Sequence, residues 1–309
     1  MIDITLLGTA ALMPLPDRAL TAVFLTCAGR SILFDCGEGT QTAARKAGVS
    51  LMKTDLIALT HYHGDHIFGL PGLLQTLYSL GRTEPLYITG PAGLQEELAP
   101  ILKLAGWMPY EIVLLPFPEE GLRPETLAKG WPTEAKLTAF PTEHRVPSQG
   151  YCFTLSRAGK FLPEKARALG VPMNQWRLLQ KGQSITVNGT VIDPDQVLGT
   201  PRKGLKFVFS GDTAACPALI DGASDADLFI SEATYGENEQ AQLSIDHGHM
   251  NFAQAASIAA QAHVKRLWLT HYSQMIEDPA EYLPNAASIF PNAVCGEDGM
   301  RLSLRFENE

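Results

Sequence analysis

Three histidines and one aspartate fall within six consecutive positions of this 309-residue chain: His61, His63, Asp65 and His66. An apolar run at residues 56–59 precedes them and predicts a buried strand, while leucines at helical spacing predict a helix over residues 67–80. The cluster therefore lies in a loop between a strand and a helix. Imidazole nitrogen and carboxylate oxygen are ligands that zinc accepts, so the loop is predicted to bind zinc, with manganese or iron as alternatives.

The spacing within the cluster favours two neighbouring ions. In an extended stretch His61 and His63 point the same way, whereas Asp65 and His66 fall where the chain turns. His61 and His63 therefore suit one ion, and Asp65 and His66 suit a second. Four side chains cannot complete two coordination shells, so further ligands are expected elsewhere in the chain. The alternative interpretation is a histidine-rich surface loop, but strand, loop and helix agree with a metal site.

Composition places the chain among globular proteins of a reducing compartment. With 45% hydrophobic residues it can bury one large core, in one domain or two. It has no run of eighteen apolar residues and its first residues do not resemble a signal peptide, so no membrane span or export is expected. The cysteines are odd in number and never at Cys-x-x-Cys spacing, which predicts neither a disulfide framework nor a zinc ribbon. The cytoplasm is the expected location.

Short strands and helices alternate along the chain. Strands are expected at residues 2–7, 23–26, 31–34, 86–89, 112–115, 137–140, 151–155, 207–210, 228–230 and 267–270. Helices are expected at residues 40–47, 93–105, 163–169 and 251–262. An Asn188-Gly189 pair between two apolar triplets predicts a hairpin with a type I′ turn. This alternation indicates an α/β fold with helices outside sheets.

The string Thr-His-Tyr-His-Gly-Asp-His-Ile-Phe-Gly-Leu-Pro-Gly-Leu-Leu at residues 60–74 resembles the ribonuclease Z branch of the metallo-β-lactamase superfamily, which processes the 3′ end of tRNA. Further matches extend along nearly the whole chain, at residues 8–9, 35–41, 81–86, 90–91, 144, 201–204, 210–213, 232–234, 248–249 and 269–271. The resemblance implies a four-layered αββα sandwich in a single domain, residues 1–309, with a small arm inserted at about residues 157–203.

The resemblance also implies the missing metal ligands. His144 lies in a loop between two expected strands, where an isolated histidine is usually a surface residue, but its segment is similar to the one that carries the family's third metal-binding histidine. Asp212 follows a buried strand, and a carboxylate there can bridge two cations, although an isolated Gly-Asp is otherwise typical of a turn. His271 is by resemblance the last ligand. His247 and His263 match no family position and are expected to be solvent-exposed or structural.

Two divalent ions, with zinc the expected metal, would then be shared among the seven ligands. His61, His63 and His144 are assigned to one ion, Asp65, His66 and His271 to the other, and Asp212 to both. Asp65 is also expected to orient the attacking water or take its proton. The resemblance supports His249 as the group that protonates the leaving 3′ oxygen, with Glu232 fixing its tautomer.

The inserted arm has the opposite charge from the rest of the chain. Residues 157–203 contain eight basic and three acidic residues, an excess of +5, whereas the whole chain carries −9, so the remainder carries −14. An ordinary solvated insertion explains such a charge equally well. By resemblance the arm is a tRNA-binding exosite, with Arg177 and Lys181 as candidate RNA contacts and Phe161 and Trp176 as interleaved aromatics. Arg18 is a further candidate for substrate binding.

Three departures from the family pattern all fall in parts expected to hold tRNA. Pro16 and Ala19 replace a lysine and an asparagine around Arg18. A Ser-Thr pair after the catalytic-loop histidine is replaced by Met250-Asn251, and a Gly-Pro element of the arm by Met-Asn-Gln at residues 173–175. Every expected metal ligand is present. Hydrolytic chemistry is therefore predicted more firmly than the tRNA substrate.

The leading hypothesis is a dimeric, zinc-dependent endoribonuclease that trims the 3′ end of precursor tRNA. The second is a metal-dependent phosphodiesterase of the same fold that acts on another RNA or a small phosphodiester. A non-catalytic RNA-binding relative is the third, and the complete ligand set argues against it. Activity on a generic phosphodiester without cleavage of precursor tRNA would separate the second hypothesis from the first.

Overall fold

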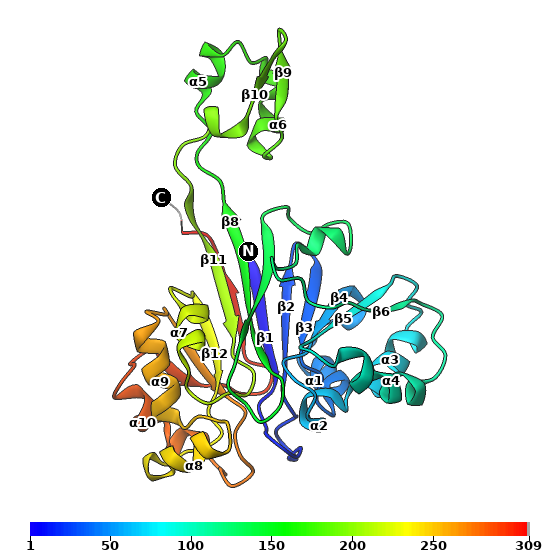
Figure 1. Cartoon of the computed structure of the whole chain (residues 1–309), viewed down its shortest axis with the longest axis vertical. Helices are drawn as coiled ribbons and strands as arrows, with labels where there is room; N and C mark the ends of the chain where they lie inside the picture. The colour runs from blue at the N-terminus through cyan, green and yellow to red at the C-terminus, as the bar shows by residue number, and fades with distance from the viewer. Residues whose placement is uncertain (308–309) are drawn as a thin grey trace. The chain divides into compact units, whose positions relative to one another are not determined.

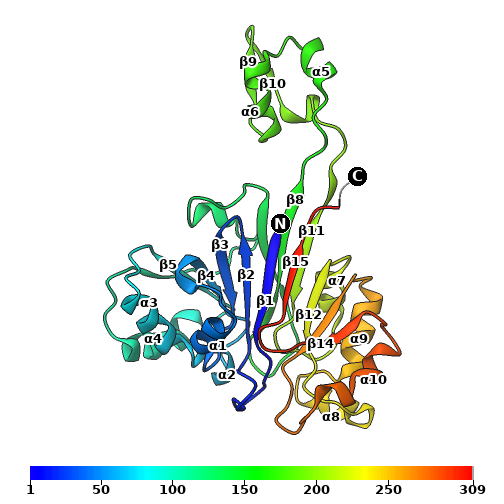
Figure 2. The same cartoon turned by 180° about the vertical axis from the view of Figure 1, so that it is seen from behind.

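Two β-sheets form the centre of the structure, a computed structural model that describes residues 1–307. Seven described strands lie side by side in the first sheet, in the order β15 (Arg301–Leu304), β1 (Ile2–Gly8), β2 (Ala22–Cys27), β3 (Arg30–Phe34), β4 (Thr54–Ala58), β5 (Leu86–Thr89) and β6 (Ile112–Leu114). The second sheet holds six, in the order β14 (Ala293–Cys295), β13 (Leu267–Thr270), β12 (Leu228–Glu232), β11 (Arg202–Phe209), β8 (Gln149–Arg157) and β7 (Ala135–Pro141). Figure 2 shows β15 beside β1, with which it pairs antiparallel.

Helices cover the outer face of each sheet (Figure 1). The first sheet packs against α1 (Thr40–Lys46), α3 (Leu70–Ser79) and α4 (Leu94–Ala105), and the second against α7 (Pro217–Ala223), α9 (Phe252–Gln261) and α10 (Leu283–Ala287). Between the sheets the Phe34 ring of β3 lies 5.6 Å from the rings of Tyr151 on β8 and Phe207 on β11, measured between centroids. The layers therefore run helix, sheet, sheet, helix, which confirms the predicted αββα fold.

The ends of parallel strands meet at one edge of each sheet. Strands β3 to β6 run parallel in the first sheet, and β11 to β14 run parallel in the second. Because the carboxyl ends of parallel strands lie at the same edge, the loops that follow β4, β11, β12 and β13 are brought together. Those loops carry most of the residues predicted to bind metal.

Local sequence explains why the helices begin where they do. Leu70, Leu73, Leu74 and Leu77 are all buried, which is the spacing of one helical face. The helix predicted from residue 67 begins instead at Leu70, because Ile67 closes a separate short helix, α2 (Gly64–Ile67). Asn251 caps α9 through a capping box with Gln254, so this helix start was predicted correctly.

Several short elements were not predicted from the sequence. They are α6 (Trp176–Gln180), α7, α8 (Ala241–Asp246), α10, β14 and β15. Each has seven residues or fewer, too few for a hydrophobic period to stand out. Among the described residues no helix is long and apolar enough to cross a bilayer.

The chain divides into two compact units, residues 1–154 with 206–309, and residues 155–205. The smaller unit has its own core, built around the buried residues Ala166, Val171, Leu179, Ile185, Ile192 and Val197. It contains α5 (Pro163–Ala168), α6 and a hairpin of β9 (Ile185–Val187) and β10 (Thr190–Ile192). Asn188 and Gly189 have φ of 51° and 81°, so the predicted type I′ turn is confirmed.

The two aromatic residues of the smaller unit serve its core rather than an open surface. Phe161 and Trp176 pack against that core with their ring centroids 5.2 Å apart. The indole nitrogen of Trp176 donates to the carbonyl of Val171, 3.0 Å away. Both side chains are partly buried, and the Arg167 guanidinium lies over the Trp176 ring, 5.6 Å from its centroid. Aromatic and basic side chains are therefore interleaved here, and their contact with RNA stays a prediction.

Candidate metal centre

The seven predicted ligands come together from four segments of the chain, each next to the end of a strand. His61, His63, Asp65 and His66 follow β4, His144 lies between β7 and β8, Asp212 follows β11 and His271 follows β13. His63 caps the short helix α2, and Asp65 and His66 lie within it, so the turn of the helix aims them differently from His61. All seven are buried or partly buried.

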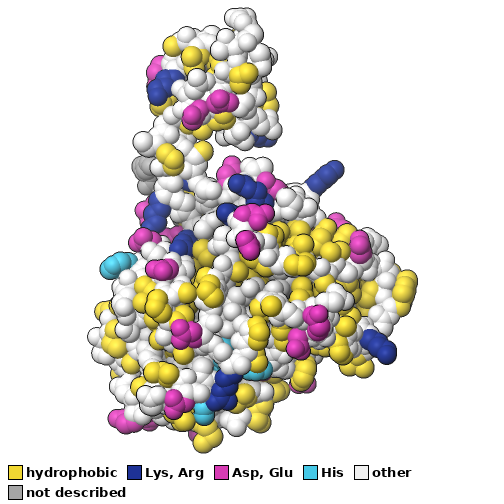
Figure 3. Space-filling view, viewed as in Figure 1, with side chains coloured by type: hydrophobic (Ala, Val, Ile, Leu, Met, Phe, Trp, Pro, Cys, Tyr) yellow, Lys and Arg dark blue, Asp and Glu magenta, His cyan; other side chains and the backbone are white. Residues whose placement is uncertain are grey.

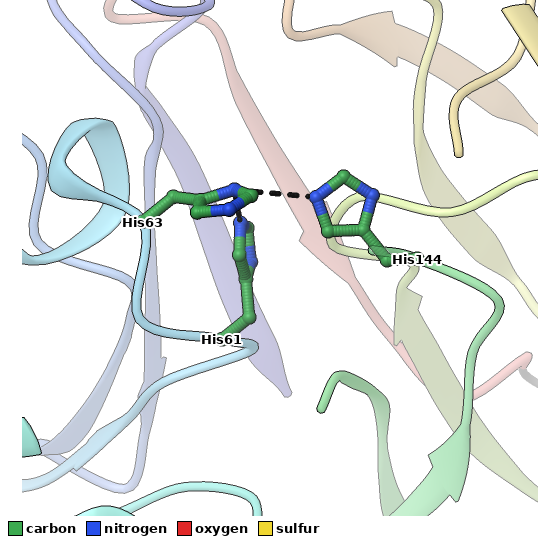
Figure 4. A group of neighbouring side chains, drawn as sticks. All are labelled: His61, His63 and His144. Carbon is green, nitrogen blue, oxygen red and sulfur yellow. Dashed lines mark hydrogen bonds between the residues drawn. The ribbon is translucent and has the colours of Figure 1, made fainter. Parts of the chain in front are cut away.

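One group of nitrogens is formed by His61, His63 and His144, whose rings point toward one another in Figure 4. The distance from His61 Nε2 to His63 Nδ1 is 3.0 Å, and that from His63 Nδ1 to His144 Nε2 is 3.2 Å. Burial and the neighbouring imidazoles lower the pKa of His61 well below its usual range, so its ring is neutral and offers a lone pair. Three converging imidazoles are typical of a zinc site.

A second group is formed by Asp65, His66 and His271. Nε2 of His66 lies 3.3 Å from Nε2 of His271, which lies 3.4 Å from Oδ2 of Asp65. The backbone N–H of Leu12 donates to the same Asp65 oxygen at 2.8 Å and fixes the carboxylate. Although burial opposes it, hydrogen bonding to His271 and the nearby His66 hold the pKa of Asp65 well below its usual range. The carboxylate is therefore charged.

Asp212 stands between the two groups. One of its oxygens lies 3.3 Å from His66 Nε2, and the other lies 3.2 Å from His271 Nε2 and 3.7 Å from His61 Nε2. Burial alone would raise the pKa of Asp212, but the His271 and His66 rings hold it well below its usual value. Its Oδ1 is buried and makes no good hydrogen bond to any described residue. A buried, charged and unsatisfied oxygen amid imidazole nitrogens fits a site for divalent cations.

Buried hydrogen bonds orient two of the ligands. Asp35, which has a left-handed φ of 57°, accepts hydrogen bonds from Thr60 N at 2.7 Å and from His66 Nδ1 at 2.8 Å. Thr234 Oγ1 lies 2.9 Å from His271 Nδ1 and donates to Glu232 Oε2 at 2.7 Å. In both histidines these contacts hold Nδ1 on the outer side of the ring, so Nε2 is the atom that faces the site.

Gly248 orients a third ligand. Its carbonyl accepts a hydrogen bond from His144 Nδ1 at 2.7 Å. Its φ is 72°, and a Cβ at this position would lie 2.9 Å from His144 Nδ1. Glycine is therefore required by both conformation and space. The sequence matches covered Asp35, Thr234 and Gly248, but their positioning roles were not predicted.

His249 and Glu232 form a pair beside the metal ligands. His249 Nδ1 lies 2.9 Å from Glu232 Oε1, and that carboxylate also accepts hydrogen bonds from Thr213 N and Met250 N. Burial would lower the pKa of His249, but the Glu232 carboxylate outweighs it and raises this pKa to about 9. The ring therefore carries a proton that it can donate, as the prediction for a general acid requires.

A cavity of about 480 Å³ gives access to the centre. It is lined by His63, Asp65, His144, Asp212, His249 and His271 of the predicted site, and by Arg145, Tyr235 and His247. The two histidines without a family match differ, since His263 is exposed whereas His247 is half-buried and lines this cavity.

The three candidate substrate-binding residues lie outside this cavity. Arg18 lines a second cavity, of about 630 Å³, and its Nη2 donates to the carbonyl of Ile276 at 2.7 Å. Arg177 and Lys181 are exposed residues of the smaller unit. A substrate larger than the cavity could still contact Arg18, Arg177 or Lys181.

Comparisons with known proteins agree with this geometry. Residues 30–272 match the model of the β-lactamase superfamily domain. The chain is 43% identical over 307 residues to ribonuclease Z of Lachnoclostridium phytofermentans, covering 99% of both chains, and 42% identical over 312 residues to ribonuclease Z of Clostridium tetani, covering all of both. The chain belongs to the ribonuclease Z family. Its membership confirms the resemblance seen in the sequence and makes it a metal-dependent hydrolase.

Solved structures support the same family. The short form of human tRNase Z superposes with a TM-score of 0.66 at 27% identity, covering 98% of this chain and 100% of that one. A diphosphatase of the PhnP family superposes equally well, with a TM-score of 0.66 over the full length of both chains. Its identity is only 16%, so this likeness shows the fold alone.

Replacing Thr234 by valine is expected to weaken metal binding. Valine keeps the shape but removes the oxygen that accepts the His271 Nδ1 proton, and loss of such a supporting bond costs roughly 10–100-fold in metal affinity. Competition with a chromophoric zinc chelator measures this affinity. Thr234→Ser, which keeps the hydroxyl, is the matched control. An unchanged affinity in Thr234→Val would contradict the positioning role.

Proposed function

We propose that this ribonuclease Z family member is an endoribonuclease that uses two divalent ions to hydrolyse the phosphodiester at the 3′ end of precursor tRNA. The observation that carries the proposal is the pairing of two ligand groups around Asp212 with a protonated His249 at the same cavity. Curated relatives that match the whole chain are named ribonuclease Z. The proposal extends their activity to this chain.

We assign His61, His63 and His144 to one ion, Asp65, His66 and His271 to the second, and Asp212 to both. The ligand chemistry favours zinc, while manganese and iron accept the same donors. When bound, the ions would lower the pKa of the attacking water and offset the charge of the phosphodiester. The chain's own side chains then handle the protons.

Two side chains supply the acid and base functions. Asp65, anchored by the Leu12 N–H, is charged and can accept a proton from the attacking water. His249 is protonated and held by Glu232, so it can donate a proton to the departing 3′ oxygen. Glu232 is 1% exposed and does not reach the cavity, so it acts by orienting His249 and stabilising its charge.

The RNA is proposed to contact the inserted arm and the loop around Arg18 as well as the cavity. Arg177 and Lys181 are exposed on α6 and just after it, where their charges are open to phosphate groups. Met173 is 71% exposed in the stretch that replaces the family's Gly-Pro element. The arm therefore keeps two exposed basic side chains, Arg177 and Lys181, shortly after the uncharged stretch in which the family motif is lost.

A phosphodiesterase that acts on another RNA or a small phosphodiester is the second candidate. One observation favours it, since Phe161 and Trp176 are partly buried against the core of the arm, which leaves less of each ring open for stacking on a base. The metal centre would serve either substrate. The two candidate functions differ only in the substrate that the arm and the cavity rim would bind.

A homodimer is also part of the proposal. Large hydrophobic side chains are exposed on and beside α3 and α4, among them Leu104 at 80% and Trp107 at 76%. The ring centroids of Trp107 and Tyr78 lie 6.4 Å apart, which joins the two helices in one apolar surface. A second copy of the chain would cover this surface.

Replacing His249 by alanine is expected to lower the rate of precursor tRNA cleavage by roughly 10²–10⁴-fold, because the general acid is lost. Single-turnover cleavage of an unmodified precursor with zinc or manganese measures the rate. Bound metal, measured by elemental analysis, should stay the same, since His249 is assigned to neither ion. Full activity of His249→Ala would contradict its role, and a wild-type protein that cleaves only a generic phosphodiester would favour the second candidate.

Reversing two charges of the arm is expected to weaken tRNA binding. Arg177→Glu with Lys181→Glu should raise the dissociation constant about tenfold, because exposed ionic contacts are each worth up to about 1 kcal/mol. The salt dependence of binding should also become shallower. Lys53→Glu with Lys129→Glu, two exposed positions of the larger unit, makes the same charge change as a control. If the two double variants bound precursor tRNA with equal affinity, the arm would not be part of the tRNA-binding surface.

A further inference from the structure

One part of the cavity rim carries positive charge and hydrogen-bond donors that the proposed mechanism does not use. Arg145, Tyr235 and His247 line the cavity beside His249, and none of them is a proposed metal ligand or proton carrier. Figure 3 shows histidine side chains and a Lys or Arg side chain exposed close together on one face. The chain carries a net charge of −14 outside the arm. The Arg145 guanidinium therefore places a positive charge at the cavity of an otherwise acidic unit.

Backbone contacts hold Arg145 and His247 next to each other. His144 Nδ1 donates to the carbonyl of Gly248, and Arg145 Nη2 donates to the carbonyl of Asp246 at 3.3 Å. These two bonds flank His247 in the chain. Arg145 and His247 therefore stand on loops that are tied together, although about a hundred residues separate them.

The guanidinium of Arg145 is available to a ligand. The side chain is exposed and forms no ion pair with any carboxylate among residues 1–307. Its one hydrogen bond to the described residues uses a single Nη2 proton, which leaves most of its five N–H donors free. A planar guanidinium with free donors suits a phosphate.

Tyr235 orients the third group. Its hydroxyl lies 2.5 Å from His247 Nδ1. When the hydroxyl donates to Nδ1, the proton of a neutral imidazole sits on Nε2, which makes no hydrogen bond to any described residue. His247 then presents an N–H donor toward the cavity, and Tyr235 acts as its positioning residue.

The distance from the acid group indicates which phosphate would bind. The ring centroid of Tyr235 lies 6.0 Å from that of His247 and 6.4 Å from that of His249. The Tyr235 ring therefore stands between His247, which it holds, and His249, which protonates the leaving oxygen, one ring-to-ring step from each. That separation suits the next phosphate along an RNA strand, on the side of the leaving group.

We infer that Arg145 and His247, with Tyr235 holding His247 in place, bind one RNA phosphate, the one on the 5′ side of the nucleotide whose 3′ oxygen is released. The inference rests on the proposed function, because it takes His249 to lie on the side of the leaving 3′ oxygen. Binding of this phosphate would favour RNA substrates whose strand continues on the 5′ side of the cleaved bond. A small phosphodiester without that phosphate would bind less well.

The test pairs a change in the substrate with a change in the protein. A precursor tRNA is made with a neutral methylphosphonate in place of that one phosphate, and a second with the methylphosphonate elsewhere in the acceptor strand. For the wild type we expect the first substitution to lower kcat/KM about tenfold, with most of the loss in KM, because a charge-assisted bond is lost. The second substitution should change it less than twofold.

Variants of the rim should lose this preference. In Arg145→Gln and in His247→Ala, the methylphosphonate at the proposed position should lower kcat/KM less than twofold relative to the unmodified precursor, while Tyr235→Phe should give an intermediate penalty. Arg45→Gln, an exposed arginine of α1 that lines neither cavity, should behave as the wild type. Arg145 is exposed, so its variant does not depend on repacking of the core.

Two results would overturn the inference. One is a wild type that cleaves both modified precursors as fast as the unmodified one, and the other is an equal penalty in the wild type and in both Arg145→Gln and His247→Ala. Failure of the proposed function is distinguishable from these, since the wild type would then leave the unmodified precursor uncut.

Discussion

Burying the negative charge of Asp212 among imidazole rings is the constraint on which the rest of the structure depends. Asp212 is 3% exposed and charged, yet its Oδ1 has no good hydrogen-bond partner among the described residues. Desolvating an ion without such a partner costs several kcal/mol. Cations held by the surrounding nitrogens would offset this cost. Without bound metal, the ligand cluster therefore lowers the free energy of unfolding, as expected of a functional site.

The αββα sandwich makes this arrangement possible by delivering side chains from strand ends. The loop after β4 comes from the first sheet, and those after β11, β12 and β13 come from the second. The aromatic contacts of Phe34 hold the two sheets face to face. A second set of buried groups, including Asp35 and Thr234, then fixes the orientation of the His66 and His271 rings. Rigid strands and buried hydrogen bonds together preorganise the centre.

Local sequence patterns predicted those parts of the site that lie within one segment of the chain. The spacing of His61, His63, Asp65 and His66 was enough to predict a metal site, because these residues share one loop. His144, Asp212 and His271 lie 81 to 206 positions away from their partners in that loop, and only the family resemblance identified them. The fold was predicted from the same resemblance and is confirmed by the layers and by the comparisons.

What the sequence did not predict depends on contacts between distant loops. Gly248 supports His144 across 104 positions, and no local pattern indicates this. His247 was set aside because it matched no family position, whereas the structure places it at the cavity through Tyr235. Phe161 and Trp176 were predicted only as aromatics interleaved with the basic residues of the arm, and the structure shows that both also pack against its small core. In each case packing decided the role.

The most direct test of the central claim is anomalous X-ray diffraction at the zinc edge from crystals of the zinc-loaded protein. The account predicts two peaks, one bounded by His61, His63 and His144 and one by Asp65, His66 and His271, with Asp212 contacting both. A single peak, or a second peak outside these residues, would contradict the two-ion centre.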